Sequence, residues 1–206
     1  MTMMQPFTIV IGIAAPLPRA NIDTDQIMPK QFLKGIDRSG LDAGFLHDMR
    51  FAAPGVRRPE FVLNRQPWDR ATFLIVGPNF GCGSSREYAV WGMMQLGIRA
   101  VIGTQFGGIF YDNCLRNGVP AILLRDDDVS KLLALAGDPP TSMITVDLPQ
   151  QAIISGPTNE RIAFDFDPLH KDILVRGLSA VAATLEHAST IRMFEEVYYR
   201  ESPWLA

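Results

Sequence analysis

Apolar residues in the middle of the chain form short continuous runs, and these alternate with stretches in which apolar and polar residues recur at helical spacing. A continuous apolar run is typical of a strand covered on both faces, whereas the second pattern is typical of an amphipathic helix. The predicted strands are 71–77, 100–104 and 120–124, and the predicted helices are 85–96, 106–117 and 126–137. This alternation predicts an α/β fold with a mostly parallel core.

Further β-type segments stand on both sides of this core. The first, 7–14, runs into Pro16, Pro18 and the polar stretch NIDTDQ, which is the pattern of a strand that delivers a loop. Short apolar segments later in the chain, separated by polar turns, predict an extra β layer packed beside the α/β unit: 142–148, 151–155 and 161–167. From Pro168 onward the pattern is mainly helical, so 168–206 is expected to form a C-terminal helical extension.

The stretch 31–59 has no strong period. It contains scattered glycines and charges, with only a weak helical pattern from Leu41 to Phe51. A long loop within a compact domain is often functional, so we expect a functional flap here. No internal repeat or linker divides the chain, and residues 1–206 are therefore predicted to form a single domain.

Composition narrows the choice of partners. Hydrophobic residues make up 47% of the chain, charged residues 20%, and the formal net charge is −3. There is no basic excess of the kind that binds nucleic acid or a membrane surface, so a small molecule or another protein is the expected partner. The apolar stretch from Phe7 to Ala15 has no preceding cationic residue and is too short to span a bilayer.

The two cysteines, Cys82 and Cys114, lie far apart and lack metal-ligand spacing. A disulfide framework or a metal or iron–sulfur site built by this chain alone is therefore not expected, and a cytoplasmic location is the simpler interpretation. We expect Cys82 to have a packing or loop role and Cys114 to belong to the core.

The stretch GPNFGCGSSREYAVWGM, 77–93, places a glycine loop between a predicted strand and a predicted helix. Ser84 and Glu87 have the spacing of a capping box, so Ser84 is a candidate N-cap. One interpretation is a well-capped helix after a tight turn. The other is an anion site at the helix N-terminus, in which Ser84 acts as a base and Arg86 binds a substrate carboxylate. In the earlier stretch NIDTDQ, Asp23 has the pattern of an Asx turn that fixes the loop.

Three ordered blocks resemble the small-subunit or swivel domain of the aconitase superfamily: NIDTDQIMPKQFL, NFGCGSSRE and IFYDNCLRNGVPAI. FVLNR and DPLHKDILVRGL also resemble the bacterial isopropylmalate isomerase small subunit. The resemblance implies a swivelling β/β/α domain that docks on a large subunit carrying a [4Fe–4S] cluster, with no cofactor on this chain. It further implies a hydro-lyase subunit of leucine biosynthesis, active only with that partner. The reaction removes water from 2-isopropylmalate and returns it at the neighbouring carbon.

The resemblance also implies roles for individual residues. Ser84 matches the serine that abstracts the proton next to a carboxylate, and Arg86 matches an arginine that binds a substrate carboxylate. Around them, the residues implied to bind substrate are Thr24, Asp25, Lys30, Phe32, Leu33, Gly83 and Ser85. Phe32 and Leu33 supply apolar surface that suits an isopropyl group.

One departure leaves the substrate open. After SSRE the family commonly continues with His-Ala-Pro-Trp, where this chain has Tyr88-Ala89-Val90-Trp91. The reaction class is unaffected. The alternative is therefore a related hydratase subunit that acts on another 2-substituted malate or maleate, such as citraconate, dimethylmaleate or homoaconitate. A third interpretation is a non-catalytic binding module that retains the same fold.

Overall fold

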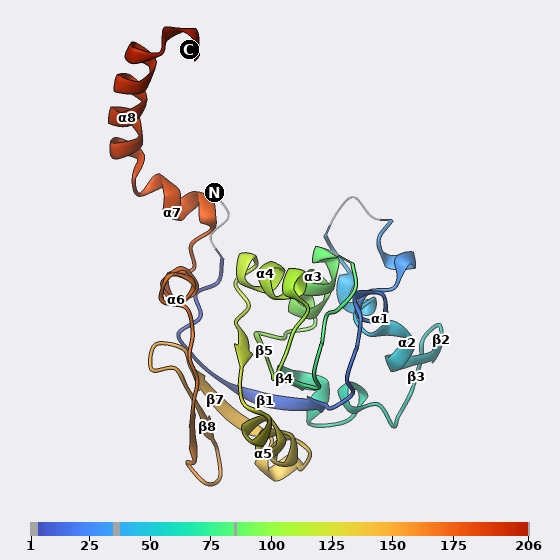
Figure 1. Ribbon diagram of the computed structural model, residues 1–206. Helices are drawn as coiled ribbons and strands as arrows, with labels where there is room; N and C mark the ends of the chain where they lie inside the picture. Colours follow the sequence, from blue (N-terminus) through green and yellow to red (C-terminus); the bar gives the residue numbers. More distant parts are fainter. Residues whose placement is uncertain (1–3, 35–37, 85, 206) are drawn as a thin grey trace.

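The computed structural model describes residues 4–34, 38–84 and 86–205. Its centre is a mixed seven-stranded sheet with the order β6-β5-β4-β1-β7-β8-β9 (Figure 1). The parallel half consists of β1 (Ile9–Leu17), β4 (Ala71–Val76), β5 (Ala100–Gly103) and β6 (Ala121–Leu123). The predicted parallel α/β core is thus confirmed.

Helices follow the parallel strands. They are α3 (Glu87–Gln95) between β4 and β5, α4 (Gly108–Arg116) between β5 and β6, and α5 (Asp126–Ala136) after β6. In Figure 1, α3 and α4 lie together on one side of the sheet and α5 lies on the other. The sheet is therefore covered on both faces, as the continuous apolar runs predicted.

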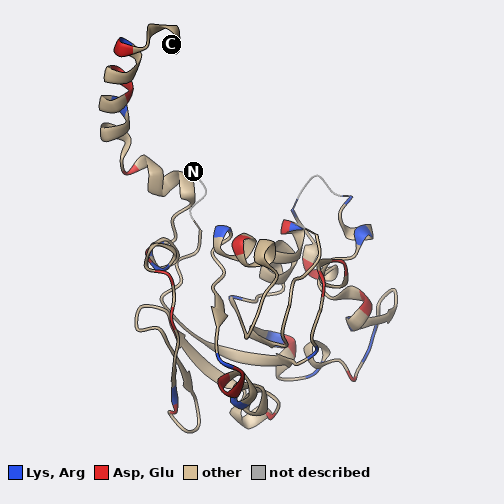
Figure 2. Cartoon of the chain, viewed as in Figure 1, with Lys and Arg blue, Asp and Glu red and all other residues tan. Residues whose placement is uncertain are grey.

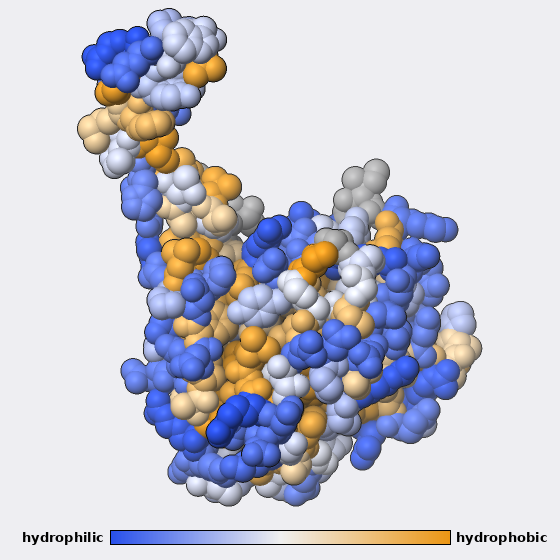
Figure 3. All heavy atoms as spheres, in the orientation of Figure 1, coloured by the Kyte–Doolittle hydropathy of each residue, from blue (hydrophilic) through white to orange (hydrophobic). Residues whose placement is uncertain are grey.

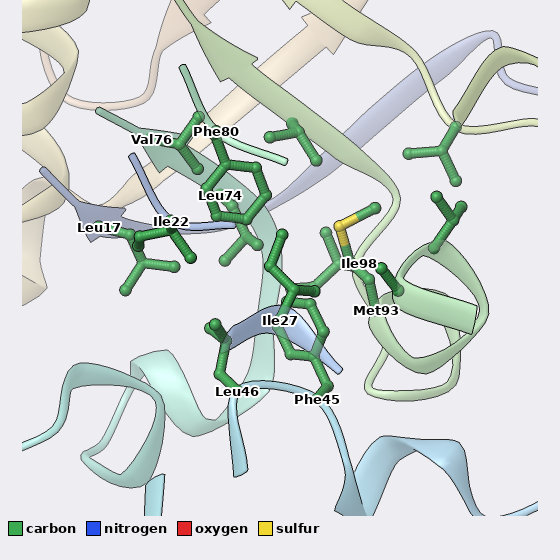
Figure 4. Packing of buried hydrophobic residues seen from close by; sticks show 14 of the residues in the cluster. Leu17, Ile22, Ile27, Phe45, Leu46, Leu74, Val76, Phe80, Met93 and Ile98 are labelled. Carbon is green, nitrogen blue, oxygen red and sulfur yellow. The ribbon is translucent and has the colours of Figure 1, made fainter. Parts of the chain in front are cut away.

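Strand β4 contributes side chains to two separate clusters of buried hydrophobic residues. Leu74 and Val76 belong to one buried cluster, whereas Phe73 and Ile75 belong to the other. Alternate residues of a strand point to opposite faces, so a strand inserted between two helical layers must be apolar throughout. Figure 4 shows the first cluster, in which Leu74 and Val76 lie near Phe80, and Met93 lies near Ile98.

The three later strands extend this same sheet. They are β7 (Met143–Asp147), β8 (Ala152–Ser155) and β9 (Arg161–Ala163), and all pair antiparallel. The long strand β1 makes the extension possible, because Ile9–Ile13 pair with β7 and Ile13–Leu17 pair with β4. The expected additional strands are thus present, and they are hydrogen-bonded to the α/β unit rather than stacked on it.

The flap, residues 31–59, contains more structure than its weak pattern indicated. It includes α2 (His47–Arg50) and a small hairpin of β2 (Phe51–Ala53) and β3 (Val56–Arg57). Phe45 and Leu46 are fully buried in the first cluster, where Figure 4 shows them beside Ile27. Before the flap lies α1 (Thr24–Ile27). Short 3-10 turns complete this region and the later loops: Lys30–Phe32, Leu41–Ala43, Val62–Asn64, Trp68–Arg70, Pro139–Thr141 and Pro203–Leu205.

The C-terminal helices differ in how they pack. Helix α6 (Pro168–Arg176) buries Leu174, whose carbonyl accepts a 2.9 Å hydrogen bond from the Phe7 N–H. Helices α7 (Ala180–Leu185) and α8 (Ala188–Glu201) project away from the body, and no described residue in them is buried (Figure 1). No helix within the described ranges is long and apolar enough to cross a membrane.

Helix α8 is amphipathic. Charges of both signs lie along it in Figure 2, and apolar side chains are visible on the same projecting arm in Figure 3. The exposed apolar residues recur at helical spacing: Ile191, Met193, Phe194, Val197 and Tyr198.

Candidate active site

Three loops meet at one edge of the sheet, where β1, β4 and β5 end. The Gly81 N–H donates to the Ile22 carbonyl at 2.8 Å, which joins the loop after β4 to the loop after β1. The Gly107 N–H donates to the Phe80 carbonyl at 2.8 Å, which joins the loop after β5 to the same centre. Carboxyl ends of parallel strands lie at a common edge, and this is where α/β proteins bind ligands.

Glycines allow these loops to approach closely. A Cβ on Gly107 would lie 2.3 Å from the Gly81 carbonyl oxygen. A Cβ on Gly81, which has φ +75°, would lie 2.2 Å from the Phe110 ring. A larger residue at Gly107 or Gly81 would push the loop after β5, or the start of α4, away from the glycine loop. Glycine is therefore required at both positions for steric reasons.

The NIDTDQ block forms a fixed turn. Oδ1 of Asp23 accepts the Gln26 N–H at 2.7 Å, which caps the short helix α1. Oδ2 of the same carboxylate accepts the Gln26 side-chain amide at 3.2 Å. The predicted Asx-type role of Asp23 is confirmed. The turn places Thr24 and Asp25 beside the glycine loop.

Thr24 connects this turn to Ser84. Its N–H donates to the Cys82 carbonyl at 2.8 Å, and its Oγ1 donates to the Ser84 carbonyl at 3.0 Å. The two hydroxyl oxygens of Thr24 and Ser84 are 3.4 Å apart. Thr24 is only 1% exposed, whereas Ser84 is on the surface. A buried threonine therefore positions an accessible serine.

Arg86 connects the same two loops by charge. Its Nη1 lies 2.5 Å from Oδ1 of Asp25 and also donates to the Met28 carbonyl at 3.4 Å. The Arg86 side chain is 16% exposed, whereas that of Asp25 is 52% exposed. The mostly buried guanidinium is thus held by the turn whose Thr24 contacts Ser84, and its planar fork suits a carboxylate ligand.

The predicted capping box is wrong. Helix α3 begins at Glu87, with Arg86 at the N-cap position, and no side chain within the described residues caps it. Ser84 lies two residues before the N-cap position, directly after Gly83, whose φ is +98°. Glu87 accepts a 2.7 Å hydrogen bond from the Asn117 side-chain amide instead of returning to the cap. The Ser84 hydroxyl is consequently not used as a cap.

The other implied binding residues occupy different surroundings. Gly83 lies against Thr24, since a Cβ there would be 3.3 Å from Thr24 Oγ1. Lys30 is exposed on the turn after α1. Phe32 and Leu33 are half-buried against the first cluster, and the Phe32 ring centroid is 4.8 Å from that of His47. Ser85 lies outside the described residues.

Several residues beside the site were not predicted from the sequence. Arg38 of the flap lies over the Trp91 ring, and the side chain of Gln95 bonds to the flap backbone. Asn117 bonds to both Trp91 and Glu87. A signal was available, because Glu87, Trp91 and Gln95 recur at i, i+4 and i+8 on one face of a helix. Tyr88 is a further neighbour, with its ring centroid 4.8 Å from that of Trp91.

The two cysteines have different environments. Cys114 is fully buried in the first cluster, and burial raises the pKa of its thiol well above the ordinary value. Its predicted core position is confirmed. Cys82 is a half-buried free thiol in the glycine loop. Across the described ranges, no group of three or more His, Cys, Asp and Glu side chains has an arrangement that would hold a metal ion.

Comparison with known proteins places this chain among relatives. The aconitase C-terminal domain family matches residues 4–126. The chain is 52% identical over 202 residues to 3-isopropylmalate dehydratase small subunit 1 of Mannheimia succiniciproducens, covering 98% of this chain and 99% of that protein. It is 49% identical to 3-isopropylmalate dehydratase small subunit 2 of Salmonella typhimurium, covering 98% and 96% respectively.

A solved structure agrees with these sequence matches. The crystal structure of 3-isopropylmalate dehydratase from Methanocaldococcus jannaschii matches with a TM-score of 0.65 and 26% sequence identity, covering 91% of this chain and 99% of that chain. The resemblance of the three sequence blocks to the aconitase superfamily is thereby confirmed. The chain belongs to the aconitase C-terminal domain family and, within it, to the 3-isopropylmalate dehydratase small subunits.

Proposed function

We propose that this chain is the small subunit of a hydro-lyase that isomerises 2-isopropylmalate to 3-isopropylmalate in leucine biosynthesis, acting only with a large iron–sulfur subunit. Relatives that align with nearly its whole length carry the name 3-isopropylmalate dehydratase small subunit. The observation that carries the residue assignment is the 2.5 Å contact between Asp25 and Arg86, which brings two distant loops together next to Ser84.

Arg86 binds a carboxylate of the hydroxy-diacid. Its ion pair and its hydrogen bond within the described residues both use Nη1, and the guanidinium carries further N–H donors that suit a carboxylate. Asp25 and the Met28 carbonyl hold the group in one orientation before substrate arrives. A fixed guanidinium loses less conformational freedom when it binds, which favours a defined position of the substrate's α-carbon.

Ser84 removes the proton next to that carboxylate. A serine hydroxyl is a weak base, so its alkoxide form needs strong stabilisation. The guanidinium of Arg86 and the N-terminal end of α3 supply positive potential at this position. Thr24 holds the Ser84 backbone, with its own hydroxyl 3.4 Å from the serine hydroxyl. Loss of the hydroxyl then yields 2-isopropylmaleate, and water adds at the neighbouring carbon.

The partner completes the site. The large subunit carries the [4Fe–4S] cluster, as the resemblance to the aconitase superfamily implies. When bound there, the cluster supplies a Lewis-acid iron for the substrate hydroxyl. The free thiols Cys82 and Cys114 suit the cytoplasm, where thiols stay reduced.

Other residues of the same region contribute to substrate binding. Gly83 lets the chain pass close to Thr24, and Ser85, the next residue in the sequence after Ser84, is proposed to contact the substrate as well. Lys30, exposed on the turn after α1, adds positive charge that favours a dianionic substrate. Phe32 and Leu33 form the apolar surface for the isopropyl group. Both belong to the flap, which precedes β4 in the chain.

The test is reconstitution with the large subunit of the same organism under anaerobic conditions. The pair is expected to interconvert the two isopropylmalates, and the small chain alone is expected to be inactive. Ser84→Ala should lower kcat roughly 10²–10⁴-fold, the range for loss of a general base, while assembly is retained. Ser189→Ala, at an exposed serine of α8, is the matched control. Unchanged turnover in Ser84→Ala would overturn the role of Ser84 as the base, and no turnover by the wild-type pair would support a binding module instead.

Tyr88 favours a second candidate substrate. It stands in the first turn of α3, where the family commonly has histidine, and its ring is tilted by 54° against that of Trp91. The bulkier phenol can alter the shape of the pocket beside Arg86. A panel containing isopropylmalate, citraconate, dimethylmaleate and homoaconitate distinguishes the two candidates. Greater turnover of any of the other acids would remove isopropylmalate from first place.

A further inference from the structure

The flap segment Arg38–Gly44 lies directly against α3. A Cβ on Gly92 of α3 would be 2.8 Å from the Leu41 carbonyl oxygen and 2.2 Å from the end of the Met28 side chain. At Gly92 the helix has no side chain, so its backbone packs directly against this segment. Such close packing makes the position of the segment sensitive to the neighbouring side chains of the same helix.

Gln95 bonds to this segment at two points. Its Oε1 accepts the Leu41 N–H at 2.7 Å, and its Nε2 donates to the Arg38 carbonyl. A carboxamide both donates and accepts, so one side chain joins two backbone groups of the flap to the last turn of α3. Neither bond belongs to a helix or a strand ladder, and the segment takes part of its position from a single glutamine.

Trp91 supports the same segment one helical turn earlier. The guanidinium of Arg38 lies 3.8 Å from the centroid of the Trp91 ring. The indole Nε1 donates to Asn117 Oδ1 at 2.9 Å, and Asn117 Nδ2 donates to Glu87 at 2.7 Å. The indole is thereby also held at its N–H edge by Asn117, at the end of α4. Glu87 directly follows Arg86, so the network begins next to the proposed carboxylate-binding residue.

The clamped segment in turn determines where Phe32 lies. The Gly44 N–H donates to the Leu41 carbonyl at 3.0 Å, which closes the turn that begins at the clamp. A Cβ on Gly44 would be 2.7 Å from the Phe32 ring, so the ring rests on this turn. Displacement of Leu41 therefore moves the surface against which Phe32 packs.

We propose that Gln95 and Trp91 are positioning residues that clamp the Arg38–Gly44 segment onto α3 and thereby set discrimination for the substrate's alkyl substituent. This inference rests on the proposed function, in which Phe32 faces that substituent. The clamp acts on binding of the alkyl group. It leaves the position of Ser84 and Arg86 unchanged, because Thr24 and Asp25 hold those residues from another loop.

The first test measures hydration of 2-isopropylmaleate and of citraconate, its methyl counterpart, by the reconstituted pair. Gln95→Ala removes two hydrogen bonds and should raise KM for 2-isopropylmaleate roughly tenfold. KM for citraconate should change less, and kcat should change less than about twofold for both acids. Met94→Ala, at an exposed neighbour on the same helix, is the control and should resemble the wild type. A fall in kcat with unchanged KM would overturn the proposal.

Graded variants separate the clamp from a general loss of folding. Gln95→Glu keeps the acceptor for Leu41 but cannot donate to Arg38, so its KM should lie between those of wild type and Gln95→Ala. Trp91→Phe keeps an aromatic face under Arg38 and should retain most of the discrimination. Trp91→Leu removes that face and should lose it. Equal discrimination in Trp91→Leu and wild type would contradict the role of the stacked ring.

The second test does not depend on the reaction. Trypsin cleaves after arginine, and its rate at Arg38 in the isolated full-length chain reports release of the segment. Gln95→Ala should speed this cleavage severalfold, while Met94→Ala should not. If the wild-type pair fails to hydrate 2-isopropylmaleate, the proposed function fails, yet faster cleavage would still support the clamp. An unchanged cleavage rate in Gln95→Ala would overturn the clamp itself.

Discussion

The hydroxyl of Thr24 donates a 3.0 Å hydrogen bond to the carbonyl of Ser84, a residue 60 positions later in the chain. Thr24 is buried and Ser84 is accessible. The bond therefore joins a buried residue with the accessible one proposed to remove the substrate's proton. The position of the serine depends on the loop after β1 as much as on its own glycine loop.

Replacing Thr24 by valine tests this dependence. The change keeps the shape of the side chain but removes the donor to the Ser84 carbonyl. Because the Arg86 N–H still donates to that carbonyl at 2.9 Å, the cost in stability should be only about 1 kcal/mol. Turnover by the reconstituted pair should fall roughly tenfold, since Ser84 is less well positioned. Steady-state kinetics and thermal unfolding measure both, with Thr190→Val on α8 as the exposed control.

Adjacent glycines test the close approach of the loops. Gly107 has ordinary φ and ψ angles of −60° and 130°, so an alanine there is opposed by contact with Gly81 rather than by backbone strain. Gly107→Ala should destabilise the chain by about 1–3 kcal/mol, as overpacking does. A Cβ on Gly108 meets nothing within 4 Å, and Gly108→Ala should be neutral or stabilising. Urea unfolding of the two variants gives the comparison, and equal midpoints would contradict the steric account.

Thiol labelling distinguishes the two cysteines. Burial raises the pKa of Cys114, so less of it is thiolate at pH 8 and the thiol is also shielded from reagent. Cys82 should therefore react first with a thiol reagent in the native chain, and Cys114 only after denaturation. Mass spectrometry of labelled peptides identifies the site. Because Cys82 lies in the glycine loop, binding of the large subunit and substrate should slow its labelling, while rapid labelling of Cys114 in the native chain would contradict the buried position.

Truncation tests the independence of the C-terminal arm. Removing residues 187–206 deletes α8, in which no described residue is buried, so thermal unfolding of the remaining chain should shift little. Removing residues 168–206 also deletes α6, with buried Leu174 and its hydrogen bond to Phe7. That second truncation should destabilise the chain by several kcal/mol, about the cost of losing a buried leucine and its neighbours. A large loss of stability in the shorter truncation would show that α8 packs on the body in solution.

Much of the fold follows from local patterns. In the run 71–77, the β4 residues that pack into the two hydrophobic clusters are all apolar. Gly118, just after the end of α4, has the positive φ expected at a helix end. Elements of this kind are specified by residues close together in the sequence. Their existence and order were therefore predictable without knowledge of the remaining chain.

The flap and the start of α3 were less predictable, because their side chains bond to or pack against residues that are distant in the sequence. Ser84 and Glu87 have ideal capping spacing, yet Glu87 bonds to Asn117 and the helix begins later. In the flap, Phe45 is buried because of packing against Ile27 and other residues of the first cluster, and its own segment has no strong period. Where a side chain's best partner is distant, local spacing does not indicate it.

The sequence by itself determined the parallel core, the order of its elements and the residue types that bear chemistry: serine and arginine after a glycine loop, and an aspartate-rich turn after the first strand. Only the tertiary structure decided how they combine. Because parallel strands end at a common edge, Asp25 meets Arg86 and Thr24 meets Ser84. The link from Arg38 through Trp91 to Asn117 likewise exists only once the flap, α3 and α4 are packed together, since each contact joins elements that no local pattern relates.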